Sequence, residues 1–139
     1  MELSLPRDPR LVTLVRHVIS RILADLRAPA DARDDIELAV TEACDNAVRH
    51  ATSASQYQVA LRVSTDGCEV EIADPGPGLD PAALSQATDG DPEEEESGRG
   101  LGLMQALVDD VTLVGQEKGT RLRLNKRWSP RHQDIARVA

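Results

Sequence analysis

The sequence is nearly without aromatic residues: its 139 residues include one Trp, one Tyr and no Phe. Hydrophobic residues still make up 40% of the chain, so the core must be built almost entirely from aliphatic side chains. The scarcity of rings argues against a single-strand nucleic-acid platform, where bases stack on aromatic side chains. The net charge of −8 disfavours duplex nucleic acid, because that binding depends on neutralising phosphates. We therefore expect no direct nucleic-acid partner.

Cysteine and long apolar runs are also scarce. The two cysteines, Cys44 and Cys68, are too few and too isolated for a disulfide framework or a Cys-rich metal site, so we expect them to be small core residues. No stretch approaches the roughly 18 consecutive apolar residues of a membrane helix. No segment has the basic start and apolar stretch of a signal peptide. We expect a soluble, cytoplasmic protein with no membrane partner.

The hydrophobic pattern predicts one domain that alternates between helix and strand periodicity. We expect a folded domain over residues 1–126 and a basic C-terminal tail over residues 127–139. The fold class should be α+β: a two-layer sandwich with a mostly antiparallel, mixed sheet and the helices on one face. The predicted elements are strands at 2–5, 57–63, 68–72, 111–114 and 122–124, with helices at 9–26, 31–50 and 101–108.

The segment from Ser85 to Gly98 is polar and acidic and has no apolar periodicity. We therefore expect it to be a mobile flap. It carries four consecutive acids, Glu93–Glu96, which would repel a triphosphate unless they face solvent. Either they form a solvated surface, or they recognise a basic partner or oppose closure of the flap without one.

The second predicted helix carries Glu42, Asn46 and His50 at positions i, i+4 and i+8, which places them on one face. An Asn oxygen can bind a hard cation such as Mg²⁺, and a carboxylate can orient or deprotonate a hydroxyl. The same spacing is also typical of a solvated helix face, with His50 as a capping or packing residue. By itself this pattern leaves both interpretations open.

Two glycine-containing segments follow. Asp74 ends a predicted strand just before Gly76 and Gly78, where the backbone can approach a ligand closely, and an Asp there can accept a hydrogen bond from an exocyclic amine such as that of adenine. An ordinary turn would have the same composition. The segment Gly98–Gly102 is predicted to open a helix, and free N–H groups at such a loop favour phosphate oxygens. It contains Arg99, the only cation between residues 63 and 117, but it lacks the GxGxxG spacing and the P-loop Lys.

Four segments, taken in order, carry a family resemblance: Glu42–Asn46, Asp74–Gly78, Gly98–Gly102 and Gly119–Thr120. Together they resemble the nucleotide-binding motifs of the GHKL ATPase superfamily, which has the Bergerat ATP-binding fold. The short length and the sequence TEACDNAVRHA resemble those of the anti-sigma-factor serine kinases of the RsbW/SpoIIAB type. The resemblance covers residues 3 to 126, and four modest motifs in the right order make it specific.

The resemblance implies a role for each matching position, with ATP and Mg²⁺ as cofactors. Asn46 would be the metal ligand, Glu42 would be the catalytic base or orienter for an attacking serine hydroxyl, and Asp74 would read the adenine amine. Arg99 is the least secure of these assignments, because cation placement in this loop varies within the family. The other cofactor-binding positions would be Gly76, Gly78, Arg99, Gly100, Leu101, Gly102 and Thr120.

The function implied by the resemblance is a protein serine/threonine kinase that phosphorylates a STAS-domain anti-anti-sigma protein and regulates a sigma factor, acting as a homodimer. The alternative is an ATP-dependent partner-binding module with little or no kinase activity. A sensor histidine kinase is disfavoured, because the three histidines (His17, His50 and His132) lack a phosphoacceptor domain around them.

Overall fold

Five strands form one sheet in the order β1-β2-β3-β5-β4, and three helices accompany it within the residues that the structure describes. The computed structural model describes residues 1–49, 56–74, 92–116 and 119–129, and only the backbone of residues 92–99 and 114–116. Every described strand pairing is antiparallel, so the expectation of a mixed sheet is wrong in that detail. The elements are β1 (Glu2–Pro6), α1 (Pro9–Asp25), α2 (Ala30–Arg49), β2 (Gln56–Ser64), β3 (Gly67–Asp74), α4 (Pro92–Leu107), β4 (Asp110–Gln116) and β5 (Gly119–Arg127).

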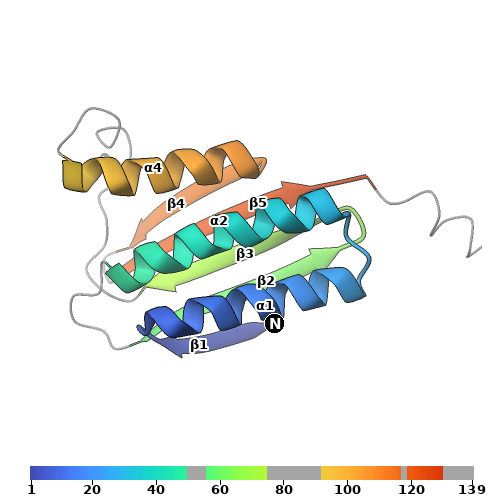
Figure 1. Ribbon diagram of the computed structural model, residues 1–139, viewed down its shortest axis with the longest axis horizontal. Helices are drawn as coiled ribbons and strands as arrows, with labels where there is room; N and C mark the ends of the chain where they lie inside the picture. The colour runs from blue at the N-terminus through green and yellow to red at the C-terminus, as the bar shows by residue number, and fades with distance from the viewer. Residues whose placement is uncertain (50–55, 75–91, 117–118, 130–139) are drawn as a thin grey trace, which may run out of the picture.

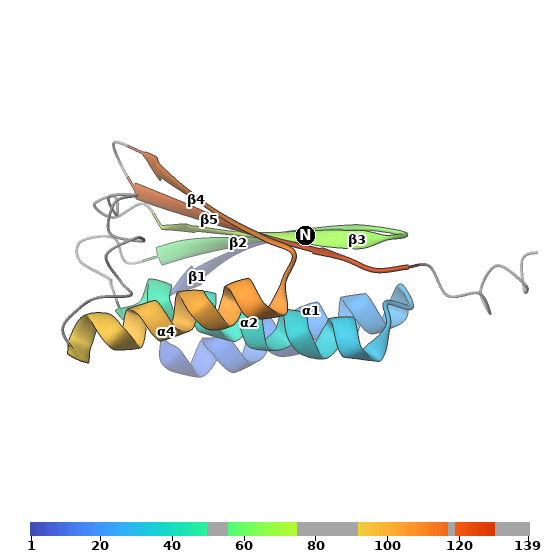
Figure 2. The ribbon, with the colours of Figure 1, turned by 90° about the horizontal axis from the view of Figure 1, so that it is seen from above.

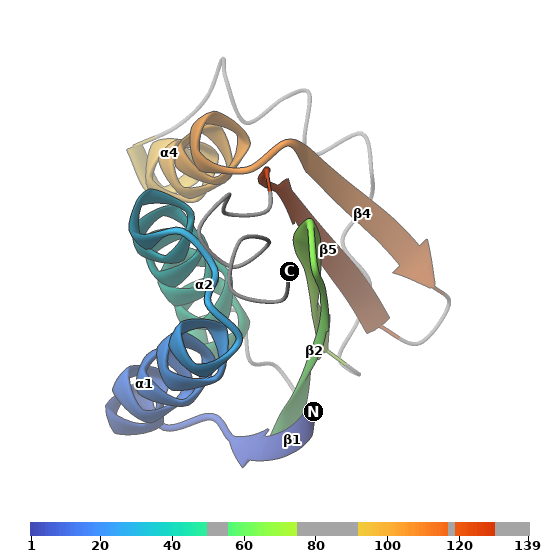
Figure 3. The same cartoon turned by 90° about the vertical axis from the view of Figure 1, so that its right-hand side faces the viewer.

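The helices form one layer and the sheet the other. Figure 1 looks through the helices onto the strands, with α2 between α1 and α4. Figures 2 and 3, turned by 90°, show that all three helices cover the same face of the sheet. The predicted α+β two-layer sandwich is therefore confirmed. No helix in the described part of the chain is both long enough and apolar enough to span a membrane.

The first helix begins where the sequence predicts it. The Asp8 carboxylate accepts a hydrogen bond from the Arg10 backbone N–H at 3.0 Å, and Pro9 supplies the first helical position. The helix then buries one residue in each turn along a single stripe against the sheet: Val12, Val15, Ile19 and Leu23.

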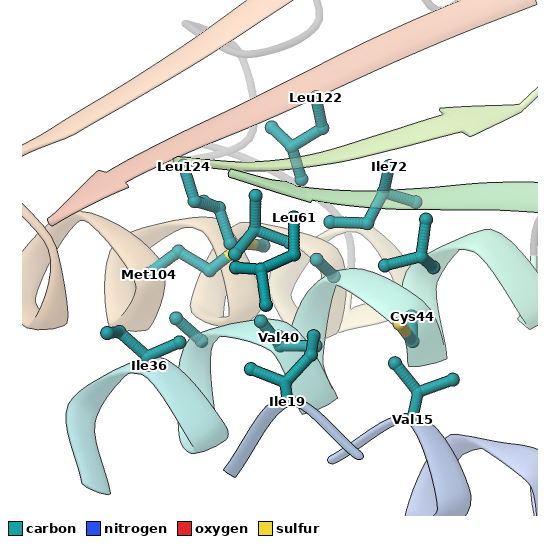
Figure 4. Close-up of a cluster of buried hydrophobic side chains, with 14 of the residues drawn as sticks. Val15, Ile19, Ile36, Val40, Cys44, Leu61, Ile72, Met104, Leu122 and Leu124 are labelled. Carbon is teal, nitrogen blue, oxygen red and sulfur yellow. The ribbon is translucent and has the colours of Figure 1, made fainter. Parts of the chain in front are cut away.

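The core between the layers is aliphatic, as the composition requires. Figure 4 shows side chains from α1, α2 and α4 meeting those of the strands, with Met104 of α4 among them. Cys44 and Cys68 are free and buried in this core, and burial raises the pKa of both thiols to about 12. The prediction that they are small core residues is confirmed.

The second half of the segment expected as a flap is helical in the structure. Residues 85–91 lie outside the described residues, but α4 begins at Pro92, so residues 92–98 are helical. The sequence does contain a helix start: Pro92 fits the first position, and the acids Glu93–Glu96 in the first turns complement the positive end of the helix dipole. The absence of apolar periodicity obscured this start.

Lys126 and Trp128 hold the C-terminal end of β5 in place. The Lys126 ammonium donates to the Leu107 carbonyl at 2.7 Å and to an Asp35 carboxylate oxygen at 3.1 Å, which joins β5 to the C-terminus of α4 and to α2. Trp128, expected in the tail, packs back: its indole N–H donates to the Thr65 carbonyl at 3.1 Å. The strand β5 itself runs to Arg127, and residues 130–139 lie outside the described residues.

Gly67 provides a test of the sheet register. A Cβ at this position would lie 2.7 Å from the Lys126 carbonyl oxygen, so the backbone of β5 would have to shift. We expect Gly67→Ala to lower the free energy of unfolding by about 1–3 kcal/mol, as overpacking does. The control is Gly102→Ala in α4, which meets no atom within 4 Å. It should raise stability by roughly 0.5–1 kcal/mol, since Ala favours a helix interior. Urea unfolding of both variants measures this, and equal midpoints would contradict the register.

Lys126 provides a second test. Lys126→Met keeps the buried stem but removes the charge from the end of α4, so we expect a loss of about 1–2 kcal/mol in unfolding free energy. The control is Arg127→Met, whose ion pair with Asp110 is long at 3.6 Å and exposed. It should change stability by less than about 0.5 kcal/mol. Indistinguishable urea midpoints for the two variants would show that Lys126 does not hold α4.

Candidate functional site

Most predicted site residues that the structure describes come together at one end of the molecule. The last turns of α2, the end of β3 and the start of β5 all lie at the left of Figure 1, together with the first half of α4. The positions Gly76 and Gly78 lie outside the described residues, as does His50. The side chain of Arg99 is likewise not described, so its predicted contact with a phosphate stays a prediction.

Glu42 and Asn46 face α4 across a close helix contact. A Cβ built on Gly100 would lie 3.2 Å from a Glu42 carboxylate oxygen and 3.5 Å from the Asn46 amide nitrogen. Both side chains are partly buried. Glu42 and Asn46 therefore lie on one face of α2, as expected, and Gly100 is the residue of α4 that adjoins them. Leu101 is partly buried and packs against the core, whereas Gly102 is exposed with open space around it.

The glycine-rich segment does not precede a helix. Gly98–Gly102 lies within α4, more than one turn after Pro92, so the expectation that it forms a loop opening the helix is wrong. Interior helical N–H groups bond to carbonyl groups four residues earlier, and only the first four are free. The N–H groups of Gly100 and Gly102 are therefore not directed at a ligand in this helix.

Asp74 and Thr120 are direct neighbours across two strands. They face each other as a register pair at the end of β3 and the start of β5. Ile72, two residues before Asp74, points to the helix side, so Asp74 belongs to the same face of the sheet. These two predicted nucleotide-binding positions therefore lie side by side. Their contact with a nucleobase stays a prediction.

Arg7 is a site residue that the sequence patterns did not identify. Its guanidinium forms a two-pronged ion pair with Asp74, in which Nη2 contacts Oδ1 and Nη1 lies 3.3 Å from Oδ2. Nη1 also donates to the Ala47 carbonyl in the last turn of α2. Residues 7 and 74 are far apart in sequence, and no local motif connects them. No local pattern predicts this contact, because it depends on the sheet order β1-β2-β3, which brings the end of β1 towards the end of β3.

The donor set fits a nucleotide-bound Mg²⁺ better than a metal held by protein alone. Within the ranges that the structure describes, no three His, Cys, Asp or Glu side chains gather as a metal-binding group. Mg²⁺ in nucleotide sites typically takes one or two protein oxygens and completes its shell with phosphates and waters. The Asn46 amide oxygen beside the Glu42 carboxylate supplies donors of that kind, and Gly100 of α4 adjoins both side chains.

Comparison with known proteins gives consistent relatives. Residues 5–126 match the histidine kinase-like ATPase domain. The serine-protein kinase RsbW of Bacillus subtilis strain 168 is 31% identical over 138 residues, which cover 91% of this chain and 84% of the relative. The anti-sigma F factor of Clostridium botulinum is 27% identical over 121 residues, which cover 82% of this chain and 84% of that protein.

Two solved structures share the fold. The RsbU and RsbW domains of a Mycobacterium tuberculosis protein align with a TM-score of 0.63 and 20% identity, covering 91% of this chain and 32% of that chain. The SiaB–SiaC complex of Pseudomonas aeruginosa aligns with a TM-score of 0.64 and 16% identity, covering 90% of this chain and 88% of that chain. The sequence matches and the common fold agree: this chain belongs to the histidine kinase-like ATPase domain family, in the branch that contains the RsbW serine-protein kinases.

Proposed function

We propose that this chain is an ATP-binding protein serine/threonine kinase that phosphorylates a STAS-domain anti-anti-sigma protein and thereby regulates a sigma factor. The observation that carries the proposal is the meeting of Glu42 and Asn46 with Gly100 at one end of the sheet. It is supported by 31% identity to a serine-protein kinase over 91% of this chain. The proposal rests on both, because the fold alone is shared by proteins of different activity.

In this proposal the two ends of the nucleotide bind to different elements. Asp74 accepts a hydrogen bond from the adenine amine, and Thr120, its register partner on β5, supports that carboxylate. Gly76 and Gly78 shape the pocket around the nucleobase. The Asn46 amide oxygen binds Mg²⁺, which supplies charge neutralisation for the phosphates when it is bound.

Glu42 would act on the protein substrate. Its carboxylate accepts the proton of the serine hydroxyl while that oxygen forms a bond to the γ-phosphorus and the bond to the β-phosphate oxygen of the leaving ADP breaks. The Glu42 position, one turn before Asn46 on the same helix, keeps base and metal ligand in a fixed relation. Arg99 would contact the γ-phosphate while that phosphoryl group is transferred to the serine oxygen.

Phosphate binding by Gly100, Leu101 and Gly102 requires that α4 open locally. The three glycines at 98, 100 and 102 each cost a helix interior about 0.5–1 kcal/mol relative to Ala, so α4 is intrinsically weakest next to Asn46. Opening at these residues would free N–H groups for phosphate oxygens without disturbing Met104, which anchors the rest of the helix in the core.

The partners and the assembly belong to the same proposal. We propose a homodimer located in the cytoplasm, with α1 as a candidate contact surface because its outer side carries exposed arginines such as Arg21. The alternative, a nucleotide-dependent binding module with little kinase activity, is separated from the kinase by the second of the two experiments below.

Calorimetry of ATP and ADP with and without Mg²⁺ tests the site. We expect the purified wild type to bind both nucleotides, Asp74→Asn to bind at least about tenfold more weakly, and Asn46→Ala to lose its dependence on Mg²⁺. Glu71→Gln is the matched control, because Glu71 lies on the same strand but the opposite face, paired with Arg121. No binding by the wild type at millimolar nucleotide would refute the proposal and leave a partner-binding scaffold.

Phosphoryl transfer tests the role of Glu42. With γ-labelled ATP and a purified STAS-domain protein of the same organism, we expect the wild type to label the partner. Glu42→Gln should bind ATP but transfer phosphate about 10²–10⁴-fold more slowly, as expected for loss of a general base. Asp34→Asn, an exposed change on the same helix, serves as the control. A wild type that binds ATP and the STAS protein without labelling it would instead support the binding-module alternative.

A further inference from the structure

We infer that Arg7 is the residue that positions Asp74 for adenine and therefore sets the preference of this site for ATP over GTP. The inference rests on the proposed function, since it assigns a role within the same nucleotide site. Arg7 lies between β1 and α1, outside all four motifs that carry the family resemblance.

The guanidinium of Arg7 lies inside the protein. Only 6% of the Arg7 side chain and 18% of the Asp74 side chain are exposed. Surface ion pairs are weakened by solvent and by side-chain entropy, but a pair this deep is held in one geometry by its surroundings. The Ala47 carbonyl provides a third contact point, one residue after Asn46. Arg7 therefore connects the end of β3 with the last turn of α2, where the metal-binding residue would lie.

The shape of the contact suits a positioning role. The flat guanidinium presents two parallel donors to the two carboxylate oxygens, which fixes the plane of the Asp74 carboxylate; a single ammonium cannot do this. A terminal carboxylate otherwise rotates broadly about its last bond. Each carboxylate oxygen can accept more than one hydrogen bond, so the pairing with Arg7 does not by itself prevent a bond to a ligand.

The charge of the contact accounts for the choice of base. A carboxylate held by guanidinium donors offers only acceptors to a nucleobase. Adenine presents an amine donor at C6, whereas guanine presents a carbonyl acceptor there. A fixed Asp74 carboxylate can therefore bond to adenine and repels the guanine oxygen. An Asp74 whose orientation is not fixed would lose part of this discrimination, because the amine bond depends on its direction.

The test measures ATP and GTP affinity for Arg7→Lys, alone and combined with Asp74→Asn. We expect Arg7→Lys to weaken ATP binding roughly five- to fiftyfold, as for a misdirected charged hydrogen bond, with GTP affinity nearly unchanged. In the Asp74→Asn background Arg7→Lys should have no further effect, because Arg7 acts through that carboxylate. The matched control is Arg10→Lys, whose pair with Asp8 is on the surface and whose side chain is 89% exposed. It should leave both affinities unchanged.

The outcomes separate the inference from the proposed function. A wild type that binds neither nucleotide refutes both. A wild type that binds ATP, with an Arg7→Lys variant that retains the ATP-to-GTP ratio, overturns the inference and leaves the proposed function intact. An equal loss of affinity in the Asp74→Asn background also overturns it, since Arg7 would then act on stability alone. Thermal unfolding verifies that each variant is folded, and Arg7→Gln, which removes the charge and the two-pronged contact, replaces Arg7→Lys if that variant is not.

Discussion

The packing of α2 against the sheet is the constraint on which the arrangement of the site depends. Its buried face is made of small and branched residues that let the helix approach the strands closely: Ile36, Ala39, Val40, Ala43, Cys44 and Ala47. Because a helix repeats every 3.6 residues, burying this face leaves Glu42 and Asn46 at its edge, toward α4. There they meet Gly100, where a side chain would be crowded by the Glu42 carboxylate. The packing of the core thus orients the functional pair.

The helix α4 combines two opposing requirements. Its second half is anchored, since Met104 is fully buried and the Leu107 carbonyl accepts a hydrogen bond from Lys126. Its middle contains three glycines at alternate positions (98, 100 and 102), and glycine lowers helix stability. Such a conflict between local preference and observed structure is typical of functional segments. Gly100 also has a packing reason, because it allows α4 to lie against Glu42 and Asn46. Gly102 has none in this structure, which makes it the stronger sign that these residues serve a ligand.

Much of this arrangement could be predicted from the sequence, because it is encoded locally. The Asp8–Pro9 helix start, the hairpin turn at Asp66–Gly67 and the pairing of the two C-terminal strands all follow from short patterns. The family motifs identified Asp74 and Thr120 as nucleotide-binding positions, and the two residues are neighbours in the sheet. Apolar periodicity does not predict the start of α4 at Pro92, because residues 93–98 carry no apolar side chain. The contact of Arg7 with Asp74 could not be predicted, since it depends on how β1, α2 and β3 assemble. The roles of the site residues remain predictions, because those roles depend on contacts with a ligand.

Two inward-facing cations show how this acidic chain stabilises its helix layer. Arg7 donates to a carbonyl in the last turn of α2, and Lys126 donates to one in the last turn of α4. Both positions lie at the negative end of a helix dipole, where a positive charge is favourable. Each cation also pairs with a carboxylate, Arg7 with Asp74 and Lys126 with Asp35, so its burial is compensated. The two contacts hold opposite ends of α2, but they differ in consequence. The carboxylate paired with Lys126 lies on α2 away from the site, whereas the carboxylate paired with Arg7 is the proposed adenine ligand. An inward-facing cation that donates to a helix C-terminus and pairs with a carboxylate therefore stabilises the fold at one end of α2 and orders the site at the other end.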